Sequence, residues 1–548
     1  MEPIFTDKQL NNMSREDLIS LMKIVQEQTK KKDTEIQLLK DKQKELEFLN
    51  AMLSDRLTLA QRKQFGASSE KYAEGYEQMN LFNEAEASAD AETEELFEEI
   101  RPSSYKRKKR KGKKEEDLSN FETVETRTYK LEGEARYCPE CGKKYSVVTK
   151  ETVKRLRFVP AKFEVEEEIT YVYSCPKCGA MKRPEKEPSL IRGSIATPSL
   201  VAGIMNAKYV NGMPLARQER EFARYDLDLS TKTMANWIIN CADRYLKPLY
   251  QLMKEELLES RYIHCDESRI QVLGEPDQKG TTQNWMWVYL TDEFSGSPQM
   301  VLFDYERTRA GYHPVNFLGD RFHGYLTCDG YQAYHSLGEG IIISGCLTHA
   351  RRRFDAALTA LKKDFTKEQL KETVAYQAMS RIGILYKIEE MLHDKTPEEK
   401  YEERQKQSRP VMDAMFEWLH TMEDSVDRSS LIGDAILYTL NQEVYLRRYL
   451  EDGHLSIDNN SAERALKNFA VGRRNWLFAK SVRGADASAL VYSITETALL
   501  NHLKPYAYLT YILDELRKMG AFPKEEELKK LLPWSENLPE YCRTKLKK

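Results

Sequence analysis

Two pairs of cysteines constrain the fold of this chain more than any other feature. The pairs read CPEC (Cys138, Cys141) and CPKC (Cys175, Cys178), and 33 residues separate them. Thiolates held close together by two tight turns supply a tetrahedral four-sulfur zinc site. Between the pairs, "RLRFVP" and "KFEVEEEITYVY" alternate as strands do. We therefore predict a zinc ribbon with structural Zn²⁺, which contributes folding energy; the alternative is free buried thiols.

The length and composition narrow the class of protein. A chain of 548 residues is too long for one hydrophobic core, so we expect about three or four domains. No run of about 18 apolar residues occurs and the first residues form no apolar signal core, so the sequence predicts neither a membrane span nor export. We expect a cytoplasmic protein. Nine cysteines without a secretory signal argue against a disulfide framework.

The N-terminal region has a heptad pattern. Apolar residues recur at one position of a seven-residue repeat and at the partner position of the same repeat. They are Leu18, Val25, Leu39, Leu46 and Leu53 at the first, and Leu21 and Leu49 at the second. Lys32 and Glu35 interrupt this seam. The pattern predicts a coiled coil of modest stability and a homo-oligomer, the alternative being a long amphipathic helix that packs on its own chain.

A charged linker follows. Residues 84–100 hold eight acids and residues 101–114 hold nine bases, although the net charge of the chain is only −3. Such charge density predicts disorder. The basic run can neutralise phosphates, or it can be a solvated tether whose charges partly cancel against the acidic run. Its candidate DNA contacts are Lys106, Arg107, Lys108, Lys109 and Arg110.

Residues 197–250 have helical patterns, with Ser230 or Thr231 placed to cap the helix that contains Trp237. A helix-turn-helix is one interpretation, in which "STKTMANW" enters a major groove and Lys232 contacts DNA. A helical spacer without DNA contact is the other.

The next region predicts a mixed sheet. "YIHCDESRIQVL", "NWMWVYLT" and "PQMVLFDY" have the pattern of a strand meander, a short helix at "HPVNFLGD" follows, and "GYLTCDGYQAY" and "GIIISGCLTH" are two more strands. Asp266 and Asp329 then fall at or near strand ends. If these strands are neighbours, the two carboxylates converge and favour hard divalent cations. A helical segment of nearly a hundred residues follows.

Beyond that segment, Glu463 admits two interpretations. Asn460 and Glu463 have the spacing of a capping box, in which both side chains bond N–H groups of a helix start. Alternatively, Glu463 completes a metal site with the two aspartates.

Several motifs, in this order, resemble the bacterial insertion sequence 66 family of transposases. They are "QFGASSEKY", the two CxxC pairs, "PLARQE", "HCDES", "CDGYQAY", "CLTHARRRF", "DNNSAERALKNFAVGRRNWLFAKSVRGADASA" and "PYAYL". The resemblance covers nearly the whole chain. The sequence departs from the family pattern at Lys467 and Asn468, where an Arg-Pro pair is expected. This departure affects no expected metal ligand.

The resemblance implies a DNA transposase with a ribonuclease H-like core. It implies a catalytic triad of Asp266, Asp329 and Glu463 that binds Mg²⁺ or Mn²⁺ in a two-metal site, cuts the ends of an insertion sequence and joins the 3′-hydroxyls to target DNA. It also implies that Cys346 and His349 form a C-x-x-H signature with a supporting role near the active site, the alternative being that both only pack; zinc at two ligands alone is disfavoured. Element-encoded accessory proteins are possible partners.

Arginines beside these motifs are candidates for phosphate contacts through bidentate hydrogen bonds, or are solvated helix faces. They are Arg351, Arg352, Arg353, Arg464, Arg473 and Arg474.

We thus expect a multidomain α/β and α protein. Its parts are a coiled-coil helix (1–70), a linker (71–120), a zinc ribbon (121–190), a helical DNA-binding segment (191–255), a catalytic core (256–500) with a helical insertion (about 363–452), and a helical tail (501–548). Two rival functions remain. An intact triad argues against a non-catalytic DNA-binding repressor, and only the resemblance argues against a metal-dependent structure-specific nuclease.

Overall fold

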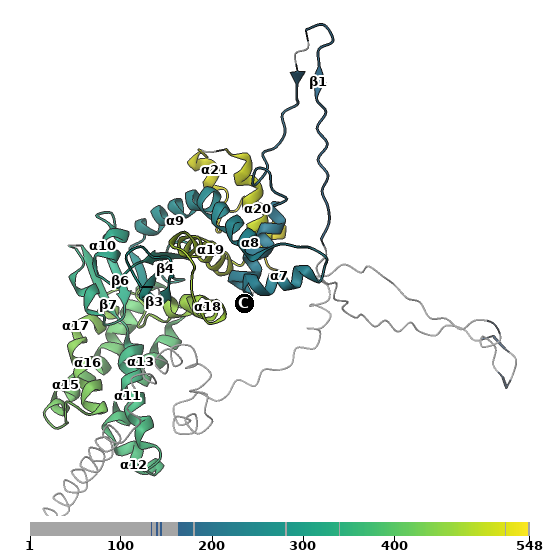
Figure 1. The fold of residues 1–548 in the computed structure, drawn as a ribbon. Helices are drawn as coiled ribbons and strands as arrows, with labels where there is room; N and C mark the ends of the chain where they lie inside the picture. The colour runs from purple at the N-terminus through teal and green to yellow at the C-terminus, as the bar shows by residue number, and fades with distance from the viewer. Residues whose placement is uncertain are drawn as a thin grey trace, which may run out of the picture. The chain divides into compact units, whose positions relative to one another are not determined.

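The computed structural model describes residues 163–178, 181–279, 282–338, 340–520 and 522–545, with Gly133, 139–140 and 143–144 (Figure 1). The predicted coiled coil, the charged linker with Lys106 to Arg110, and Cys138 and Cys141 lie outside the described residues. The contacts divide the chain into two compact units, which are described separately. Of the described residues, the first unit contains 254–271 and 282–467, and the second contains those before 254, 272–279 and those from 468 onwards.

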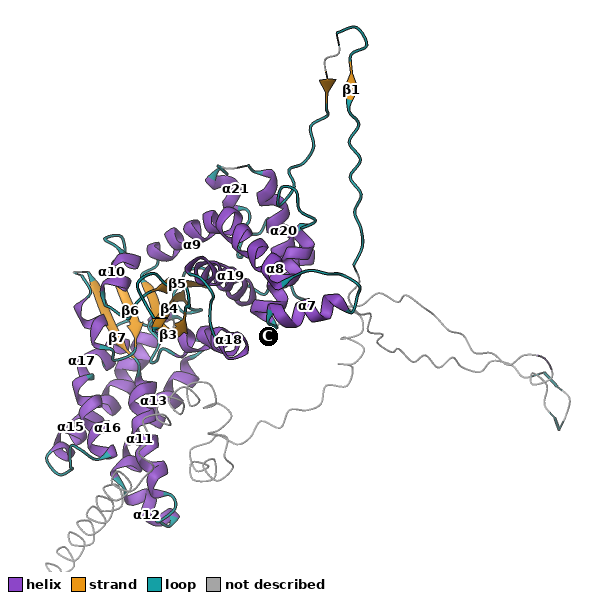
Figure 2. Cartoon of the chain, viewed as in Figure 1, coloured by secondary structure: helices purple, strands orange, loops and turns teal. Residues whose placement is uncertain are grey.

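A five-stranded mixed sheet forms the centre of the first unit (Figure 2). Its strands are β3 (Tyr262–Gln271), β4 (Gln283–Thr291), β5 (Met300–Glu306), β6 (Gly324–Cys328) and β7 (Ile341–Gly345), in the order β5-β4-β3-β6-β7. The β3–β4 and β4–β5 pairs are antiparallel, and the β3–β6 and β6–β7 pairs are parallel. The predicted meander and the two later strands are therefore confirmed.

Apolar runs form this sheet because most side chains of its strands are buried, as expected of strands covered on both faces. Seven of the nine residues of β4 and all five of β6 are buried. The helix predicted at "HPVNFLGD" is α10 (Tyr312–Leu318), and its Phe317 ring stacks on Tyr289 with the centroids 3.7 Å apart. The short helix η5 (Gln332–Ser336) follows β6.

The predicted helical segment follows β7. Its elements are α11 (Leu347–Leu361), α12 (Lys367–Glu372), α13 (Val374–Leu392), α14 (Pro397–Glu403), η6 (Arg404–Ser408), α15 (Arg409–Glu423), α16 (Leu431–Asn441), α17 (Glu443–Leu446) and η7 (Arg448–Leu450). The apolar stripe of α13 is buried at Ile382, Leu385, Ile388 and Leu392. Met391, which has the neighbouring helical position, is instead 59% exposed.

Arg404 joins the helical segment to the strap of residues 449–459, which begins within η7 and leads to the start of α18. Its side chain is only 2% exposed. Nε and Nη2 donate to the carboxylate of Glu389 at 2.9 and 2.6 Å, and Nη1 and Nη2 donate to the backbone carbonyls of Tyr449, Asp452 and Leu455 at 2.8–2.9 Å. A buried guanidinium is stable only when its donors are satisfied in this way.

The second unit is mostly helical. Its elements are β1 (Tyr173–Ser174), β2 (Met181–Lys182), α6 (Pro198–Met205), η3 (Asn206–Val210), α7 (Leu215–Ala223), α8 (Thr231–Cys241), η4 (Ala242–Leu246), α19 (Val482–Leu500), α20 (Pro505–Lys518), α21 (Glu525–Lys529) and η8 (Glu540–Cys542). Two helices, α9 (Lys247–Glu259) and α18 (Asn460–Trp476), contribute residues to both units.

Two local predictions, a helix cap and a strand, concern residues of the second unit. Ser230 caps α8 as predicted, since its side chain accepts a hydrogen bond from the N–H of Thr233. The strand expected over "KFEVEEEITYVY" is wrong for residues 163–172, which are exposed and have no strand conformation; of the described residues of that motif, Tyr173 alone belongs to a strand, the two-residue β1. Without a buried face, alternation alone does not stabilise a strand. Among the described helices, none is long and apolar enough to cross a membrane.

Replacing Arg404 by Met should destabilise the first unit by about 3–5 kcal/mol, because Glu389 is left as a buried charge without its cation. The unfolding temperature should fall by roughly 2–4 °C per kcal/mol in differential scanning calorimetry. Arg409→Met is the matched control, since the side chain of the exposed Arg409 donates to Gln405 in a contact of 2.6 Å on the same stretch and, in the part of the chain that the structure describes, forms no hydrogen bond with the strap. Equal unfolding temperatures for the two variants would contradict the importance of Arg404.

Candidate active site

The register of the sheet brings Asp266 and Asp329 together. The parallel pairing of β3 with β6 ends at His264↔Thr327, and each aspartate lies two residues beyond this pair. Because side chains alternate along a strand, both aspartates lie on the same face as that pair. Asp329 directly follows β6, as expected. Asp266 lies inside β3 and not at its end, because antiparallel pairing with β4 extends β3 past the point where β6 stops.

Electrostatics confirm that acidic groups converge at Asp266. Burial is the main cause that raises the pKa of Asp266 well above its usual range, and the charges of Glu267 and Asp329 raise it further. The charge of Glu463 acts in the same direction, although this residue belongs to a distant part of the sequence. Such a site favours a bound cation, or a proton when no cation is present.

Helix α18 carries Glu463 in its first turn, but no capping box forms. The N–H groups of Ala462 and Glu463 donate to the carbonyl of Asn459, and the N–H of Asn460 donates to Oδ1 of Asp458 at 3.0 Å. The buried carboxylate of Glu463 instead accepts two hydrogen bonds from Arg352, one of them from Nη1 at 2.9 Å and the other from Nη2. The capping interpretation is therefore wrong, because Asp458, and not Glu463, accepts the hydrogen bond from the N–H of Asn460.

Glu463 also joins Cys346 and His349. One ligand atom from each of these three residues lies within 4.8 Å of the other two, so together they could hold a metal ion. Burial lowers the pKa of His349, and its buried Nδ1 has no hydrogen-bond partner in the described structure. A neutral imidazole with an unused nitrogen is a suitable ligand. The sequence argued against a metal at Cys346 and His349 alone, and the structure adds Glu463 as a third potential ligand.

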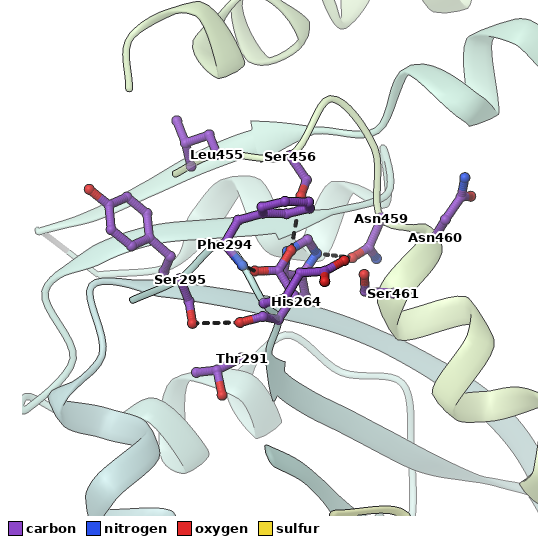
Figure 3. A network of polar contacts seen from close by, with 12 residues as sticks. His264, Thr291, Phe294, Ser295, Leu455, Ser456, Asn459, Asn460 and Ser461 are labelled. Carbon is purple, nitrogen blue, oxygen red and sulfur yellow. Dashed lines mark hydrogen bonds and ion pairs between the residues drawn. The ribbon is translucent and has the colours of Figure 1, made fainter. Parts of the chain in front are cut away.

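A polar network fixes the approach of α18 to β3 (Figure 3). The ring of His264 on β3 contacts Oδ2 of Asp292 through Nε2 at 3.1 Å and Oδ1 of Asn459 through Nδ1 at 2.9 Å. Asn459 also donates Nδ2 to the carbonyl of Cys265 at 2.8 Å, and its N–H to Sγ of Cys346 at 3.1 Å. Ser456 donates to Oδ2 of Asp292 at 2.9 Å. Every link is buried or half-buried.

The network contains a buried ion pair. Burial alone would lower the pKa of His264, but the carboxylate of Asp292 outweighs it and raises this pKa. Burial would likewise raise the pKa of Asp292, but the His264 charge and the hydrogen bonds from His264 and Ser456 lower it. Both ring nitrogens of His264 face oxygen acceptors, which requires that both carry protons.

Sequence reasoning missed a second cluster, which is built on Glu267. The Glu267 side chain is fully buried and accepts hydrogen bonds from Nε of Arg309 at 2.5 Å and from the hydroxyl of Tyr334. Burial, followed by the charge of Asp329, raises the pKa of Glu267 to about 7. Nη2 of Arg309 is also 3.9 Å from Oδ2 of Asp329. In the sequence, this cluster was signalled by the second acid of "HCDES", Glu267, which directly follows Asp266.

The guanidinium of Arg309 is held between aromatic rings. Its Cζ lies 3.8 Å from the ring centroid of Tyr331 and 5.0 Å from that of Trp285. Arg309 remains 36% exposed. A planar cation fixed on two rings and one carboxylate is preorganised for an anionic ligand.

The other predicted contact residues are more scattered. Of the three arginines after His349, Arg352 contacts Glu463, Arg353 pairs with Asp434 at 2.5 Å, and Arg351 lies 5.7 Å from the ring centroid of Tyr386. The remaining candidates, exposed or half-exposed, are Lys232, Arg464, Arg473 and Arg474.

The described half of the predicted zinc ribbon has the shape of a knuckle. Cys175 and Cys178 flank a tight turn. Hydrogen bonds from the backbone N–H groups of Cys178 and Lys177 lower the pKa of Cys175. A thiolate stabilised by N–H groups is the form that binds Zn²⁺.

Comparisons with known proteins agree with these observations. The family model "Transposase IS66 family" matches residues 193–487, which is more than half of the chain. Further models match residues 135–179 ("zinc-finger binding domain of transposase IS66"), 493–534 ("IS66 C-terminal element") and 52–120 ("Transposase C of IS166 homeodomain").

Two curated relatives come from Sinorhizobium fredii (strain NBRC 101917 / NGR234). The uncharacterized protein y4hP is 31% identical over 72% of this chain and 73% of its own length. The uncharacterized protein y4jD is 29% identical over 74% of this chain and 79% of its own length.

Asp292→Asn should destabilise the first unit in a pH-dependent way, by about 3–5 kcal/mol at most, because it leaves the buried His264 without its counterion. The raised pKa of His264 gives stability that is complete below about pH 6.5 and is lost as the pH rises through the raised value. The lowered pKa of Asp292 gives stability that is complete above about pH 4 and is lost as the pH falls through the lowered value. The loss should therefore be greatest between about pH 4 and 6.5 and diminish on either side.

Thermal unfolding across this pH range measures the effect. The exposed pair of His393 and Asp394, 3.0 Å apart, supplies the matched control Asp394→Asn. A pH-independent difference between wild type and Asp292→Asn would show that no ion pair forms at His264.

Proposed function

Because this chain belongs to the IS66 transposase family, we propose that it is a DNA transposase that cuts the ends of a bacterial insertion sequence and joins the freed 3′-hydroxyls to target DNA. The observation that carries the proposal is the convergence of three acids from separate elements: Asp266 on β3, Asp329 after β6 and Glu463 on α18. We propose these acids as the catalytic triad.

The strand order supports a ribonuclease H-like core. Three antiparallel strands are followed by two strands parallel to the first, with one acid on β3 and one directly after β6, and this arrangement supports convergence of the acids. We propose that the core covers about residues 256–500 and that the helices of about 363–452 are an insertion into it.

The acids suit a divalent cation. Burial first, and then the charges of neighbouring carboxylates, raise the pKa of Asp266, and Mg²⁺ and Mn²⁺ favour oxygen ligands grouped in this way. At such carboxylates these ions supply activation of a water or 3′-hydroxyl and stabilisation of the leaving oxygen. Asp266, Asp329 and Glu463 would hold them, with Cys346 and His349 in a supporting role beside Glu463.

Arg352 links the acids to the phosphate backbone. In this structure its two terminal nitrogens donate to both oxygens of Glu463. If Glu463 held a cation, N–H groups of Arg352 would become available to donate to a DNA phosphate. Arg309 presents a second guanidinium on the side of Asp329.

The other parts of the chain complete the proposal. The zinc ribbon of Cys138, Cys141, Cys175 and Cys178 holds structural zinc, and the α7–α8 helices with Lys232 contact DNA. The basic run and the arginines at 351, 464, 473 and 474 add phosphate contacts. The N-terminal helix forms a homo-oligomer, and the protein acts at the nucleoid.

Glu463→Gln and Asp266→Asn should each lower strand transfer at least about 100-fold, because each removes one preorganised catalytic charge. Purified chain, Mg²⁺ and labelled duplexes with the terminal repeats would measure cleaved and joined products. DNA affinity should be retained, and electron paramagnetic resonance should show weaker Mn²⁺ binding. Glu390→Gln, an exposed acid on α13, is the control. Unchanged strand transfer in Glu463→Gln would remove this residue from the triad, and cleavage without joining in the wild type would favour a nuclease.

Arg309→Met should raise the KM for duplex DNA about tenfold and reduce the salt dependence of binding by about one counterion, because one phosphate contact is lost. Arg309→Lys should not restore the wild-type values, since Lys lacks the planar fork that lies on the rings. Arg321→Met is the control, because the Arg321 side chain forms an exposed ion pair with Glu259 at 3.0 Å. An unaltered salt dependence would place Arg309 outside the DNA contact.

A further inference from the structure

An exposed apolar tip follows directly after α18. Leu477 is 65% exposed and Phe478 is 42% exposed. Both residues belong to the second unit. Two adjacent large apolar side chains in water require an explanation, because a folding chain normally buries at least one of them.

The backbone at this tip is strained. Leu477 has a φ of +63°, a left-handed conformation that side chains with a Cβ rarely adopt. The N–H of Phe478 donates to the carbonyl of Trp476 at 2.7 Å, which closes a three-residue turn around Leu477. A γ-turn with positive φ is a rare and strained arrangement. Strain of this kind persists only where the surroundings hold the chain, and it concentrates at functional positions.

The surroundings hold the tip on both sides. Before it, the Trp476 ring packs on Tyr209 with centroids 6.3 Å apart, and Asn475 donates Nδ2 to the carbonyl of Gly212 at 2.8 Å. After it, the N–H of Leu273 donates to the carbonyl of Ala479 at 3.0 Å. The backbone of the tip is therefore held on both sides, so it loses little further freedom when the tip binds a partner.

The charge around the tip favours an anionic partner. From residue 464 to residue 485 the sequence contains six Lys or Arg and no Asp or Glu. Arg474 and Lys480, on either side of the tip, are exposed. Apolar side chains framed by cations match a nucleic acid, which presents apolar base faces between phosphates.

We propose that Leu477 and Phe478 form a wedge that enters the base stack of duplex DNA at the end of the mobile element and unstacks a terminal base pair. The inference rests on the proposed function. Insertion of an apolar side chain between base steps is a known way to distort a duplex, and the aromatic ring of Phe478 replaces the stacking that the displaced base loses. Arg474 and Lys480 hold the flanking phosphates.

The test uses the full chain with Asp266→Asn to prevent cleavage, and terminal-repeat duplexes with 2-aminopurine at the last base pairs. Binding should raise the fluorescence several-fold, as the base leaves the stack. Leu477→Ala with Phe478→Ala should abolish most of this rise. Leu477→Gly with Phe478→Ala removes the same side chains and relieves the strained φ, so its loss of signal is independent of misfolding. Val444→Ala, on a side chain that is 64% exposed on α17, is the matched control and should keep the full signal.

A mismatched duplex separates a wedge from a merely structural tip. In a chain with intact Asp266, the wedge variants should cleave a matched end at least about tenfold more slowly than the wild type. They should approach the wild-type rate on an end whose last base pair is already mismatched, because unpaired bases require little unstacking. No such rescue would overturn the proposal.

Other outcomes are also decisive. An undiminished fluorescence rise in the wedge variants, with normal binding and cleavage by the wild type, overturns the wedge and leaves the proposed function in place. A wild type that neither binds nor cleaves these ends refutes the proposed function, and the wedge with it. A change of oligomeric state in sedimentation, without a change in fluorescence, assigns the tip to contacts between copies and overturns the proposal.

Discussion

The buried ion pair between His264 and Asp292 is the constraint on which the geometry of the site depends. His264 lies on β3, two residues before Asp266, and its other ring nitrogen contacts Asn459 at 2.9 Å. Asn459 in turn accepts the first backbone hydrogen bonds of α18, the helix that presents Glu463. One histidine therefore connects the strand of the first acid to the helix of the last. A neutral His264 could donate from only one ring nitrogen, and one of these two contacts would be lost.

The helical segment takes part in the same positioning. The strap of residues 449–459 is mostly irregular, so its backbone carbonyls need partners other than a helix or a sheet. Arg404 satisfies three of them and pairs with Glu389 of α13, while the network of His264 holds the far end of the strap. Two buried cations thus fix the two ends of one loop. Loss of either would leave Glu463 on a helix whose start is no longer fixed.

Local patterns predicted most of the fold but little of the network. Apolar runs predicted the five strands and α10, and Ser230 predicted a helix start, because strands and helix caps depend on residues that are close in sequence. The pairing of Glu267 with Arg309, or of Glu463 with Arg352, has no periodic signature, since it joins residues far apart through side-chain ends. Asp266 was expected at or near a strand end. Only the register shows that β3 remains paired with β4 beyond Asp266. The capping-box spacing of Asn460 and Glu463 also gave a wrong prediction, because the side chain of Asp458 accepts the N–H of Asn460 that Glu463 was expected to bind.

The charge balance of the site bears on the proposed function, because a nucleic-acid substrate would meet an excess of acids there. Asp266, Glu267, Asp329 and Glu463 bring four carboxyl groups into one region, and Arg309 and Arg352 are the cations that contact them in the described structure. Each arginine is already paired with a carboxylate. A phosphodiester would add negative charge to a site with an excess of acids, whose charges, together with burial as the main cause, already raise the pKa of Asp266. In the proposed function, Asp266, Asp329 and Glu463 would hold divalent ions that offset this excess, and Arg352 would then be available to the phosphate. Cation and DNA would therefore favour each other's binding.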